Sequence, residues 1–315
     1  MAKALDIYIG ELSSDDWKNC QAETQFQGNG LSHEHSALLL TETIQYAIHE
    51  EKVPVFALFL DAKSAFDKAL FQILSRRLYL DGTQNQNLSF IINRLENRIT
   101  FCEWDKQLCG PIVDQLGVEQ GGKNSTEYWK LYNNEQLSVP QETDFGLSTA
   151  NVHVASIGQA DDCVLVSSDL HKLKFLLHLT LQYCKKYHVQ LSPGKTKLQL
   201  YTPPGFNLDK DYLTSASSLQ IDGTPIDLVD VTEHVGVIRS PHGNLPHLLQ
   251  RFTSHNRATH SVLNAGLARG HRGNPAASLR VEKLYGVPVL LSGTASLILK
   301  QVEFNSIDSH YKNKI

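Results

Sequence analysis

Three aspartates stand at the ends of apolar runs, where their carboxylates could serve a metal ion. Asp61 follows the run Val53–Leu60, and Asp161 and Asp162 lie at the bend between two further apolar runs. Carboxylate oxygens are the hard ligands that Mg²⁺ prefers, and such sites leave room for water and phosphate oxygens. Two such ions can activate an attacking hydroxyl and stabilise a leaving oxygen, which is the chemistry of phosphoryl transfer. Taken alone, Asp161-Asp162 is more often a turn than a metal site, because aspartate is a standard turn residue.

Apolar periodicity predicts the elements that would position these carboxylates. Val53–Leu60 is a β-branched and aromatic run of strand length, typical of a buried strand. Val152–Ile157 and Cys163–Val166 predict a β-hairpin with both carboxylates at its bend. Helices are predicted over Ser36–Glu50, from Ser64 to Asp81, and over Asn87–Arg98, Ser125–Leu137, Leu170–Tyr187 and Leu245–Leu267. Further strands are predicted within Ile99–Val118, punctuated by Gly110-Pro111, over Lys197–Tyr201, and in a small antiparallel meander within Leu219–Ile238.

Length and composition indicate a globular intracellular protein, nuclear or cytoplasmic. The chain has 315 residues, of which 41% are hydrophobic and 20% are charged, enough for two or three packed subdomains. No apolar stretch approaches the roughly 20 residues that a membrane span needs, and the first residues lack the pattern of a secretory signal. The five cysteines include no CxxC pair, so neither a disulfide framework nor a zinc ribbon is indicated.

The charge is distributed unevenly along the chain. A net charge of −4 argues against a nucleic-acid binder, since such proteins usually need a basic surface. However, residues 239–281 contain six arginines and neither Asp nor Glu. This segment predicts a surface that follows phosphates, although a merely solvated, arginine-bearing helical region is the alternative.

Four motifs in one order resemble those of reverse transcriptases. They are FLDAKSAFD at Phe59–Asp67, EQGGKNS at Glu119–Ser125, GQADDCVLV at Gly158–Val166 and SPGKTKL at Ser192–Leu198. The resemblance is strongest to the non-LTR, LINE-type retrotransposon enzymes and runs from about Gln25 to the end of the chain. It implies an α+β right-hand polymerase with a fingers remnant at 1–52, a palm with an antiparallel sheet and helices at 53–240, and a helical thumb at 241–315.

The resemblance implies a set of metal ligands. Asp61 and Asp161 would be the main ligands, with Asp162 beside them and the backbone of Ala62 available to a second ion. The cofactor would be two Mg²⁺ ions, with Mn²⁺ as an alternative.

It also implies roles in nucleotide binding and proton transfer. Phe66 would be a steric gate that excludes a 2′-hydroxyl, with a core position on an amphipathic helix as the alternative. Gln120 and Gly121 would line the nucleotide pocket, although without the other motifs they would be a flexible turn. Lys195 would protonate the pyrophosphate leaving group, with an ordinary surface lysine as the alternative.

The segments after the palm motifs complete the likeness. Residues 231–238 resemble a primer-grip hairpin, and the basic segment beyond them matches a thumb that follows the primer-template backbone. Its expected nucleic-acid contacts are Arg251, Arg257, Arg269 and Arg272. The implied partners are an RNA template, a DNA primer and deoxynucleoside triphosphates.

Some positions depart from the family pattern. Gln159 stands where an aromatic residue is usual, Thr126 stands where Pro often follows, and Gln25–Ser36 lacks the Lys and Arg that clamp a triphosphate in the fingers. From the four motifs, the leading hypothesis is an RNA-directed DNA polymerase. From the missing cations, the alternative is a catalytically inactive, retrotransposon-derived fragment that binds nucleic acid. A third candidate, an enzyme that copies RNA into RNA, is disfavoured by Phe66 and by Gln120 with Gly121.

Overall fold

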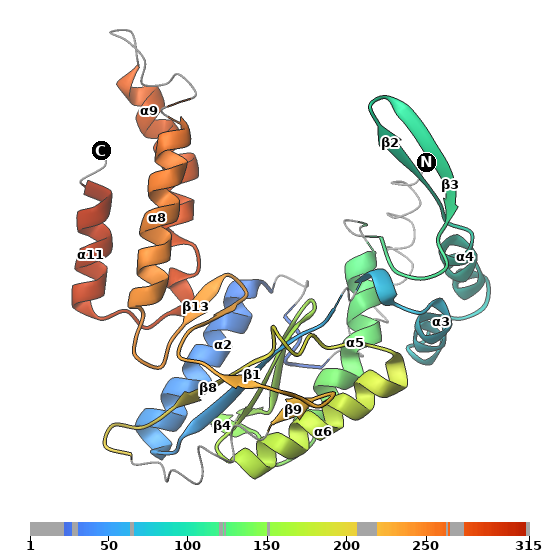
Figure 1. The fold of residues 1–315 in the computed structure, drawn as a ribbon, viewed down its shortest axis with the longest axis horizontal. Coiled ribbons are helices and arrows are strands. Elements are labelled where there is room, and N and C mark those ends of the chain that lie inside the picture. Colours follow the sequence, from blue (N-terminus) through green and yellow to red (C-terminus); the bar gives the residue numbers. More distant parts are fainter. Residues whose placement is uncertain are drawn as a thin grey trace.

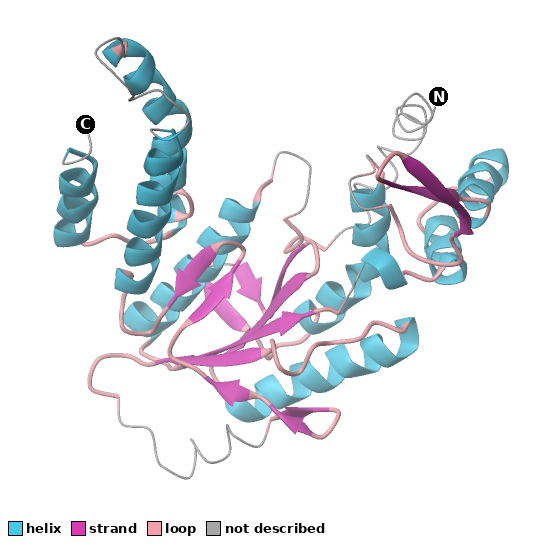
Figure 2. Ribbon diagram, turned by 45° about the horizontal axis from the view of Figure 1, so that its top comes forward, coloured by secondary structure: helices cyan, strands magenta, loops and turns pink. Residues whose placement is uncertain are grey.

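The computed structural model describes residues 22–26, 31–63, 66–119, 122, 124–149, 152–206, 219–262, 264 and 274–312. A five-stranded sheet lies between two projecting arms (Figure 1). One arm carries two helices and a β-hairpin, and the other is a group of helices at the carboxyl-terminal end. Figure 2 shows most of the strands gathered in the middle of the molecule with helices around them, and one strand pair in an arm. This mixture of helices and an antiparallel sheet confirms the predicted α+β class.

The sheet is built around one central strand. β1 (Val55–Asp61) pairs antiparallel with β7 (Asp162–Ser167) on one side and with β8 (Lys197–Tyr201) on the other. β6 (Ser156–Gln159) extends the sheet beyond β7, and β11 (Asp227–Leu228) extends it beyond β8. The predicted strands at 53–60, 163–166 and 197–201 are thus confirmed.

Alternate residues of β1 pack on opposite faces of the sheet. Phe56 lies in a core cluster shared with α5 (Ser125–Gln141) and α6 (Leu170–Tyr187). Ala57 lies in a second cluster shared with α2 (His33–Tyr46). Because successive side chains of a strand point to opposite faces, a strand that is apolar throughout must be covered on both. This burial explains the unbroken apolar run before Asp61.

Capping residues mark where α6 begins and ends. Asp169 caps α6 by accepting hydrogen bonds from the backbone N–H groups of His171 and Lys172, at 2.7 and 3.0 Å. α6 ends at Tyr187, and the C-cap residue His188 that follows it has a left-handed φ of 55°. A π-helical turn, η1 (Ala47–Glu51), continues α2. These helices confirm the predictions for 36–50 and 170–187.

The arm after β1 consists of short elements. η2 (Phe66–Lys68) and α3 (Phe71–Leu80) precede α4 (Asn85–Glu96), and β2 (Ile99–Trp104) and β3 (Gln107–Val113) form the hairpin. The hairpin stands away from the sheet (Figure 1), and both strands are exposed along their whole length.

Two predictions for this arm are wrong in detail. Ser64 lies outside the described residues, and the helix expected to continue from it is interrupted, because Leu70 has an extended backbone (φ −80°, ψ 124°) and starts a new helix. Gly110-Pro111 does not punctuate the strands but lies inside β3, where Gly110 has a φ of 135°. A glycine accepts this backbone conformation, so the strand continues through it.

The segment after β8 is not the single antiparallel meander that the sequence predicts. β11 joins the main sheet in parallel with β8, and two separate hairpins form on either side of it. The hairpins are β9 (Gln220–Ile221) with β10 (Thr224–Pro225), and β12 (Thr232–His234) with β13 (Val237–Arg239). One more small hairpin, β4 (Leu147–Thr149) with β5 (Val152–Val154), precedes β6.

The carboxyl-terminal arm packs its helices around a small apolar core of Leu248, Leu290 and Ile307. Its elements are α8 (Leu245–Val262), α9 (Pro275–Val281), η4 (Glu282–Gly286), α10 (Val287–Leu291), η5 (Thr294–Ser296) and α11 (Gln301–Lys312). No helix in the described part of the chain is both long enough and apolar enough to cross a membrane.

Candidate active site at the end of the central strand

The register of β1 against β7 brings the predicted carboxylates together. Asp61, the last residue of β1, is the Cα partner of Asp162, the first residue of β7. Residues directly opposite each other on antiparallel strands place their Cβ atoms about 4.5–5.5 Å apart on the same face. The two carboxylates, far apart in sequence, therefore lie at one end of the sheet.

Asp161 lies in the tight turn that joins β6 to β7. Gln159 pairs with Asp162, so the loop has two residues, Ala160 and Asp161, and Ala160 has a left-handed φ of 57°. An L-residue other than glycine adopts this conformation at a cost, and such strain is concentrated at functional sites. This turn presents two adjacent carboxylates beside Asp61.

The pKa values of Asp161 and Asp162 are both raised by burial and by neighbouring carboxylates. Burial raises the pKa of Asp161, and the nearby charge of Asp61 raises it further. Burial likewise raises the pKa of Asp162 to about 6, with additional contributions from Asp161, Asp61 and Glu233 on β12. Like charges in a partly desolvated site disfavour one another's ionised forms. The cluster is therefore short of positive charge.

Lys195 supplies part of that charge. Its Nζ lies 3.5 Å from Oδ2 of Asp61, and it lowers the pKa values of both aspartates in the turn. Ser192 donates a backbone hydrogen bond of 2.8 Å to the Asp61 carbonyl, and Leu191 bridges to Ala62, so the turn that carries Lys195 is anchored to the end of β1. Because the lysine side chain is 73% exposed, this ion pair contributes little to stability, and Lys195 is accessible to a substrate.

The donor set fits a divalent cation. Besides burial, the charge of Asp61 raises the pKa of Asp161, and the charges of Asp61 and Asp161 raise the pKa of Asp162, so a bound cation would relieve this repulsion. The part of the chain that the structure describes holds no ready-made group of three or more Asp, Glu, His or Cys side chains in metal-ligating positions. The strand register places Asp61 opposite Asp162, but the three side chains do not form a ligand group as they stand. Metal ligation would require them to turn toward a common ion.

Phe66 lies next to this site, in η2. Its ring packs against Trp129 of α5, with 5.3 Å between ring centroids and an angle of 32°. Phe66 is partly buried beside the larger core cluster, so the alternative prediction, a core position, is confirmed in part. Phe66 nevertheless keeps an exposed portion.

Trp129 is a residue of this site that sequence reasoning missed. Its indole Nε1–H donates a 2.8 Å hydrogen bond to the carbonyl of Ala160, in the turn that carries Asp161. The sequence feature that could have pointed to it is a tryptophan on the buried face of a predicted helix, because a buried indole N–H usually has a hydrogen-bond acceptor. The sequence alone could not say where that acceptor lies.

Comparison with known proteins decides the family. The family model described as "Reverse transcriptase (RNA-dependent DNA polymerase)" matches residues 18–228, about two thirds of the chain. The chain belongs to the reverse transcriptase family. The α+β fold, with a central sheet between two arms, is the right-hand polymerase fold predicted from the motifs.

Solved structures similar to this reverse transcriptase chain include three telomerases. That of Candida albicans with a TWJ fragment of telomeric RNA has 10% identity and a TM-score of 0.46, with 99% of this chain and 52% of that chain covered. That of Candida tropicalis with the same kind of fragment has 11% identity and a TM-score of 0.47, covering 98% and 46%. The apo Candida tropicalis enzyme truncated from its C-terminal domain has 11% identity and a TM-score of 0.44, covering 74% and 43%.

The chain spans about half the length of these telomerases. With TM-scores below 0.5, the similarity adds nothing to the family assignment. Among curated proteins, none matches the sequence.

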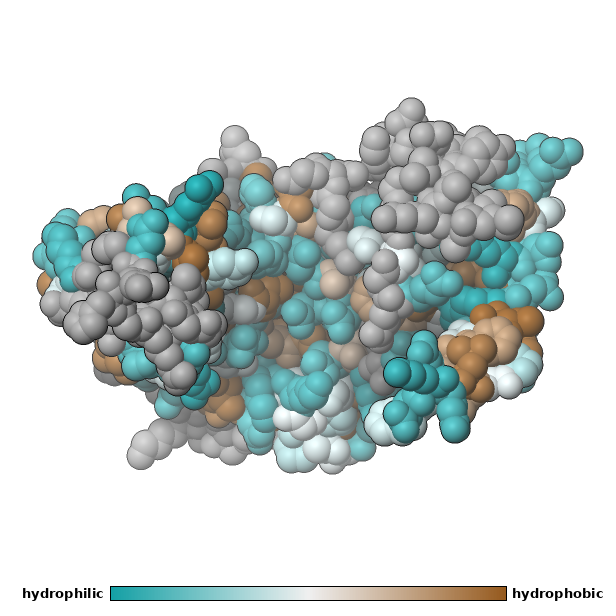
Figure 3. All heavy atoms as spheres, turned by 90° about the horizontal axis from the view of Figure 1, so that it is seen from above, coloured by the Kyte–Doolittle hydropathy of each residue, from teal (hydrophilic) through white to brown (hydrophobic). Residues whose placement is uncertain are grey.

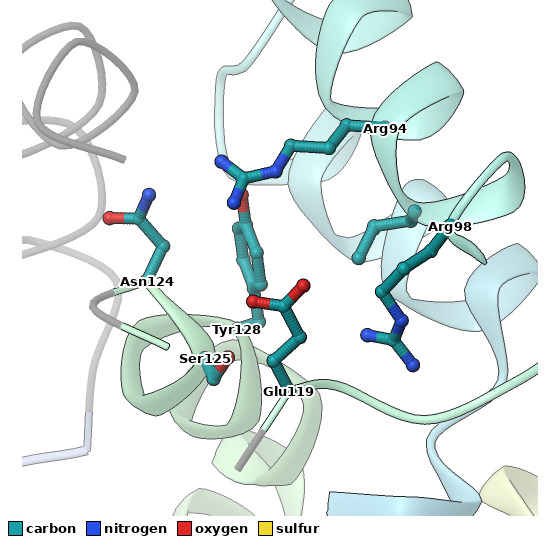
Figure 4. Close-up of a pocket in the computed structure, with 7 residues that line it drawn as sticks. Arg94, Arg98, Glu119, Asn124, Ser125 and Tyr128 are labelled. Atoms are coloured by element: carbon teal, nitrogen blue, oxygen red, sulfur yellow. The ribbon is translucent and has the colours of Figure 1, made fainter. Parts of the chain in front are cut away.

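The predicted nucleotide-pocket residues Gln120 and Gly121 lie outside the described residues. The positions around them line a pocket at the start of α5, which Arg94 of α4, Arg98 just before β2, and Glu119 also line (Figure 4). Arg98 is paired with Asp114, with 2.6 Å between Nε and Oδ2. Two arginines that were not among the predicted site residues therefore lie near this motif of the reverse transcriptase.

The basic segment divides between surface and interior. Arg257 is exposed and Arg251 is partly buried on α8, whereas Arg269 and Arg272 lie outside the described residues. Arg239, counted in the basic run, is buried and donates hydrogen bonds to Thr41 and Ala37 of α2, at 3.0 and 2.7 Å.

Two histidines of the same segment also lie in the interior. His247 is buried and bonds to the backbone of Ile238 and Ser292, and burial lowers the pKa of His247 to about 4. His255 is buried as well. Some of the basic residues that the sequence predicts for a nucleic-acid-binding surface are therefore buried and hold the fold together.

Seen from above, the surface between the two arms is hollowed and carries both hydrophilic and hydrophobic residues (Figure 3).

Proposed function

We propose that this reverse transcriptase chain is an RNA-directed DNA polymerase that adds deoxynucleotides to a primer 3′ end by two-metal phosphoryl transfer. The observation that carries the proposal is the strand register that sets Asp61 opposite Asp162, beside Asp161. Membership of the reverse transcriptase family supports the same activity.

The carboxylates are proposed to hold the ions. Asp61 and Asp161 act as the main ligands, Asp162 lies alongside, and the backbone carbonyl of Ala62 serves the second site. Two Mg²⁺ ions, or Mn²⁺ in their place, would activate the primer hydroxyl and stabilise the leaving oxygen. The raised pKa values of Asp161 and Asp162 support this assignment, because both groups gain from a nearby positive charge.

Lys195 is proposed to donate a proton to the pyrophosphate leaving group. Its ammonium is exposed and lies next to Asp61, so it can contact a substrate phosphate without crossing the protein. A positioned general acid of this kind typically contributes about 10²–10⁴ in rate.

Sugar selection is proposed to rest on Phe66. Its ring is braced by Trp129, which would keep it under the sugar of the incoming nucleotide and exclude a 2′-hydroxyl. Gln120 and Gly121 complete the nucleotide pocket in this proposal.

The remaining assignments follow from the family likeness. We propose fingers at 1–52, palm at 53–240 and thumb at 241–315, with Arg251, Arg257, Arg269 and Arg272 on the primer-template backbone. The partners are an RNA template, a DNA primer and deoxynucleoside triphosphates, and the origin is a non-LTR, LINE-type retrotransposon. The protein would act inside the cell, in the nucleus or cytoplasm.

One observation favours a second candidate function, a catalytically inactive fragment that binds nucleic acid. Within the described residues the three carboxylates do not form a ready-made metal site. In an inactive fragment, the fold would persist while the ability to hold a triphosphate and its ions is lost.

Primer extension separates the two candidates. Purified protein would be given a poly(A) template, an oligo(dT) primer, dTTP and Mg²⁺ or Mn²⁺, with Asp161→Asn as the control. The proposal expects extension by the wild type and none by the control. A folded wild type that binds the primer-template and extends nothing with either ion would establish the inactive fragment.

A further inference from the structure

We propose that Trp129 is a positioning residue, which holds the turn that carries Asp161 and Asp162 and couples it to Phe66. The inference rests on the proposed polymerase function and adds to it a residue outside the family motifs read from the sequence. Trp129 is 1% exposed, so its contacts with these groups exclude water.

The first contact is with the turn itself. Ala160 holds a left-handed φ of 57° and precedes the two aspartates, and its carbonyl accepts the indole N–H of Trp129 at 2.8 Å. The hydrogen bond fixes the direction of this carbonyl, and therefore the orientation of the peptide that leads into Asp161. Loss of the donor would leave this partly buried carbonyl without its hydrogen bond to Trp129, which favours a reoriented turn.

The helix that carries Trp129 is itself locked to the same hairpin. Two turns along α5, Leu137 fills the space beside Gly158, where an added Cβ would lie 2.4 Å from a Leu137 methyl carbon. Ser156 on β6 donates its hydroxyl to the Leu137 carbonyl at 2.8 Å. α5 therefore contacts the hairpin at two points, and Trp129 reaches the turn from a rigid support.

Trp129 also contacts two aromatic rings. Its ring stacks on Tyr132, with 5.6 Å between centroids and an angle of 15°, and packs against Phe66, with 5.3 Å between centroids. One side chain therefore touches both the proposed sugar gate and the proposed metal-binding turn. Closely packed side chains transmit displacements, so a shift of the turn is passed to the gate.

The test compares variants that each lose one buried hydrogen bond to or from α5. Trp129→Phe removes the indole donor and part of the ring. Tyr183→Phe is the matched control, because the Tyr183 hydroxyl donates to the Tyr132 carbonyl of the same helix at 3.0 Å, away from the turn. Replacement of Trp129 by 3-benzothienyl-alanine keeps the shape of the ring and exchanges only N–H for sulfur, and it decides the question if Trp129→Phe does not fold.

Three measurements are made on each protein. They are Mn²⁺ binding followed by the EPR signal of the free ion, the kcat and KM for dTTP, and the ratio of deoxynucleotide to ribonucleotide incorporation. For Trp129→Phe and the benzothienyl variant, we expect Mn²⁺ binding about tenfold weaker, as for other lost outer-shell partners of metal ligands. We expect kcat to fall about tenfold with KM changed less than about twofold, and a smaller deoxynucleotide preference. Tyr183→Phe should match the wild type in all three.

The outcomes separate the inference from the function on which it rests. If both Trp129 variants behave like Tyr183→Phe, the positioning role is wrong. If the wild type extends no primer but binds Mn²⁺ more tightly than Asp161→Asn does, the proposed function fails, and the Mn²⁺ measurements alone decide the role of Trp129. If wild type and Asp161→Asn bind Mn²⁺ equally, both proposals are overturned.

Discussion

The substitution Asp162→Asn should stabilise the protein in the absence of divalent cations. The native pKa of Asp162 is raised from 3.8 to about 6, first by burial and then by Asp161 and Asp61. A carboxyl group with a raised native pKa contributes stability below its unfolded pKa, and this stability is lost as the pH rises through the native value. At about 1.4 kcal/mol per unit the shift corresponds to roughly 3 kcal/mol, and solvent screening at this partly exposed edge lowers the expectation to about 1–3 kcal/mol.

The assay is urea unfolding in EDTA at several pH values. At pH 8 the variant should have the larger free energy of unfolding, and its advantage should shrink toward zero as the pH falls from 6 to 4. Mg²⁺ should narrow the gap at pH 8, because a ligand that binds the native wild type stabilises it. Asp144→Asn, in an exposed turn after α5, removes the same formal charge elsewhere and should show no such pattern. Equal stability of wild type and Asp162→Asn at pH 8 in EDTA would refute the reasoning.

Two further substitutions test other parts of the site, and a third tests the contacts of Glu135 on α5 with α6 and α3. Lys195→Ala should lower the single-turnover rate of extension about 10²-fold or more if the lysine is the general acid; an unchanged rate would remove it from the mechanism. Phe66→Val should raise ribonucleotide incorporation relative to deoxynucleotide incorporation, and an unaltered ratio would contradict the gate. Glu135→Gln should cost about 1 kcal/mol at pH 7, because the carboxylate accepts hydrogen bonds from Tyr187 and Lys186 and pairs with Arg77. Burial raises the pKa of Glu135, but these partners outweigh it and lower the pKa below its ordinary value of 4.5. The cost in urea unfolding should therefore shrink as the pH falls from 4.5 through the lowered native pKa, and a cost that does not change with pH would count against this explanation.

Sequence patterns predicted the elements whose structure is set locally. The 3.6-residue periodicity of Leu170–Tyr187 and the strand expected at Lys197–Tyr201 after the turn at Ser192–Gly194 predicted α6 and β8 with the bounds that the structure has. The hairpin with Asp161 and Asp162 at its bend was predicted because its two apolar runs are adjacent in sequence, but its first strand starts only at Ser156, since Val152–Val154 pairs with β4. Such elements need no knowledge of distant contacts.

Tertiary contacts were not predicted. A short strand was expected at the place of β11, within an antiparallel meander, but β11 instead pairs in parallel with β8. Arg239 was read as part of a basic surface, but its guanidinium is buried against α2, a contact across about 200 positions of sequence. Trp129 was missed because an aromatic residue on a buried helix face has the same pattern whether it only packs or also holds a catalytic turn.

Anomalous diffraction from Mn²⁺ tests the central claim most directly. Crystals of the protein with primer-template and a non-hydrolysable deoxynucleoside triphosphate would be soaked in Mn²⁺. The account predicts two peaks about 3.5–4 Å apart, both within ligand distance of Asp61 and Asp161. Peaks located elsewhere, or none between the ends of β1 and β7, would contradict it.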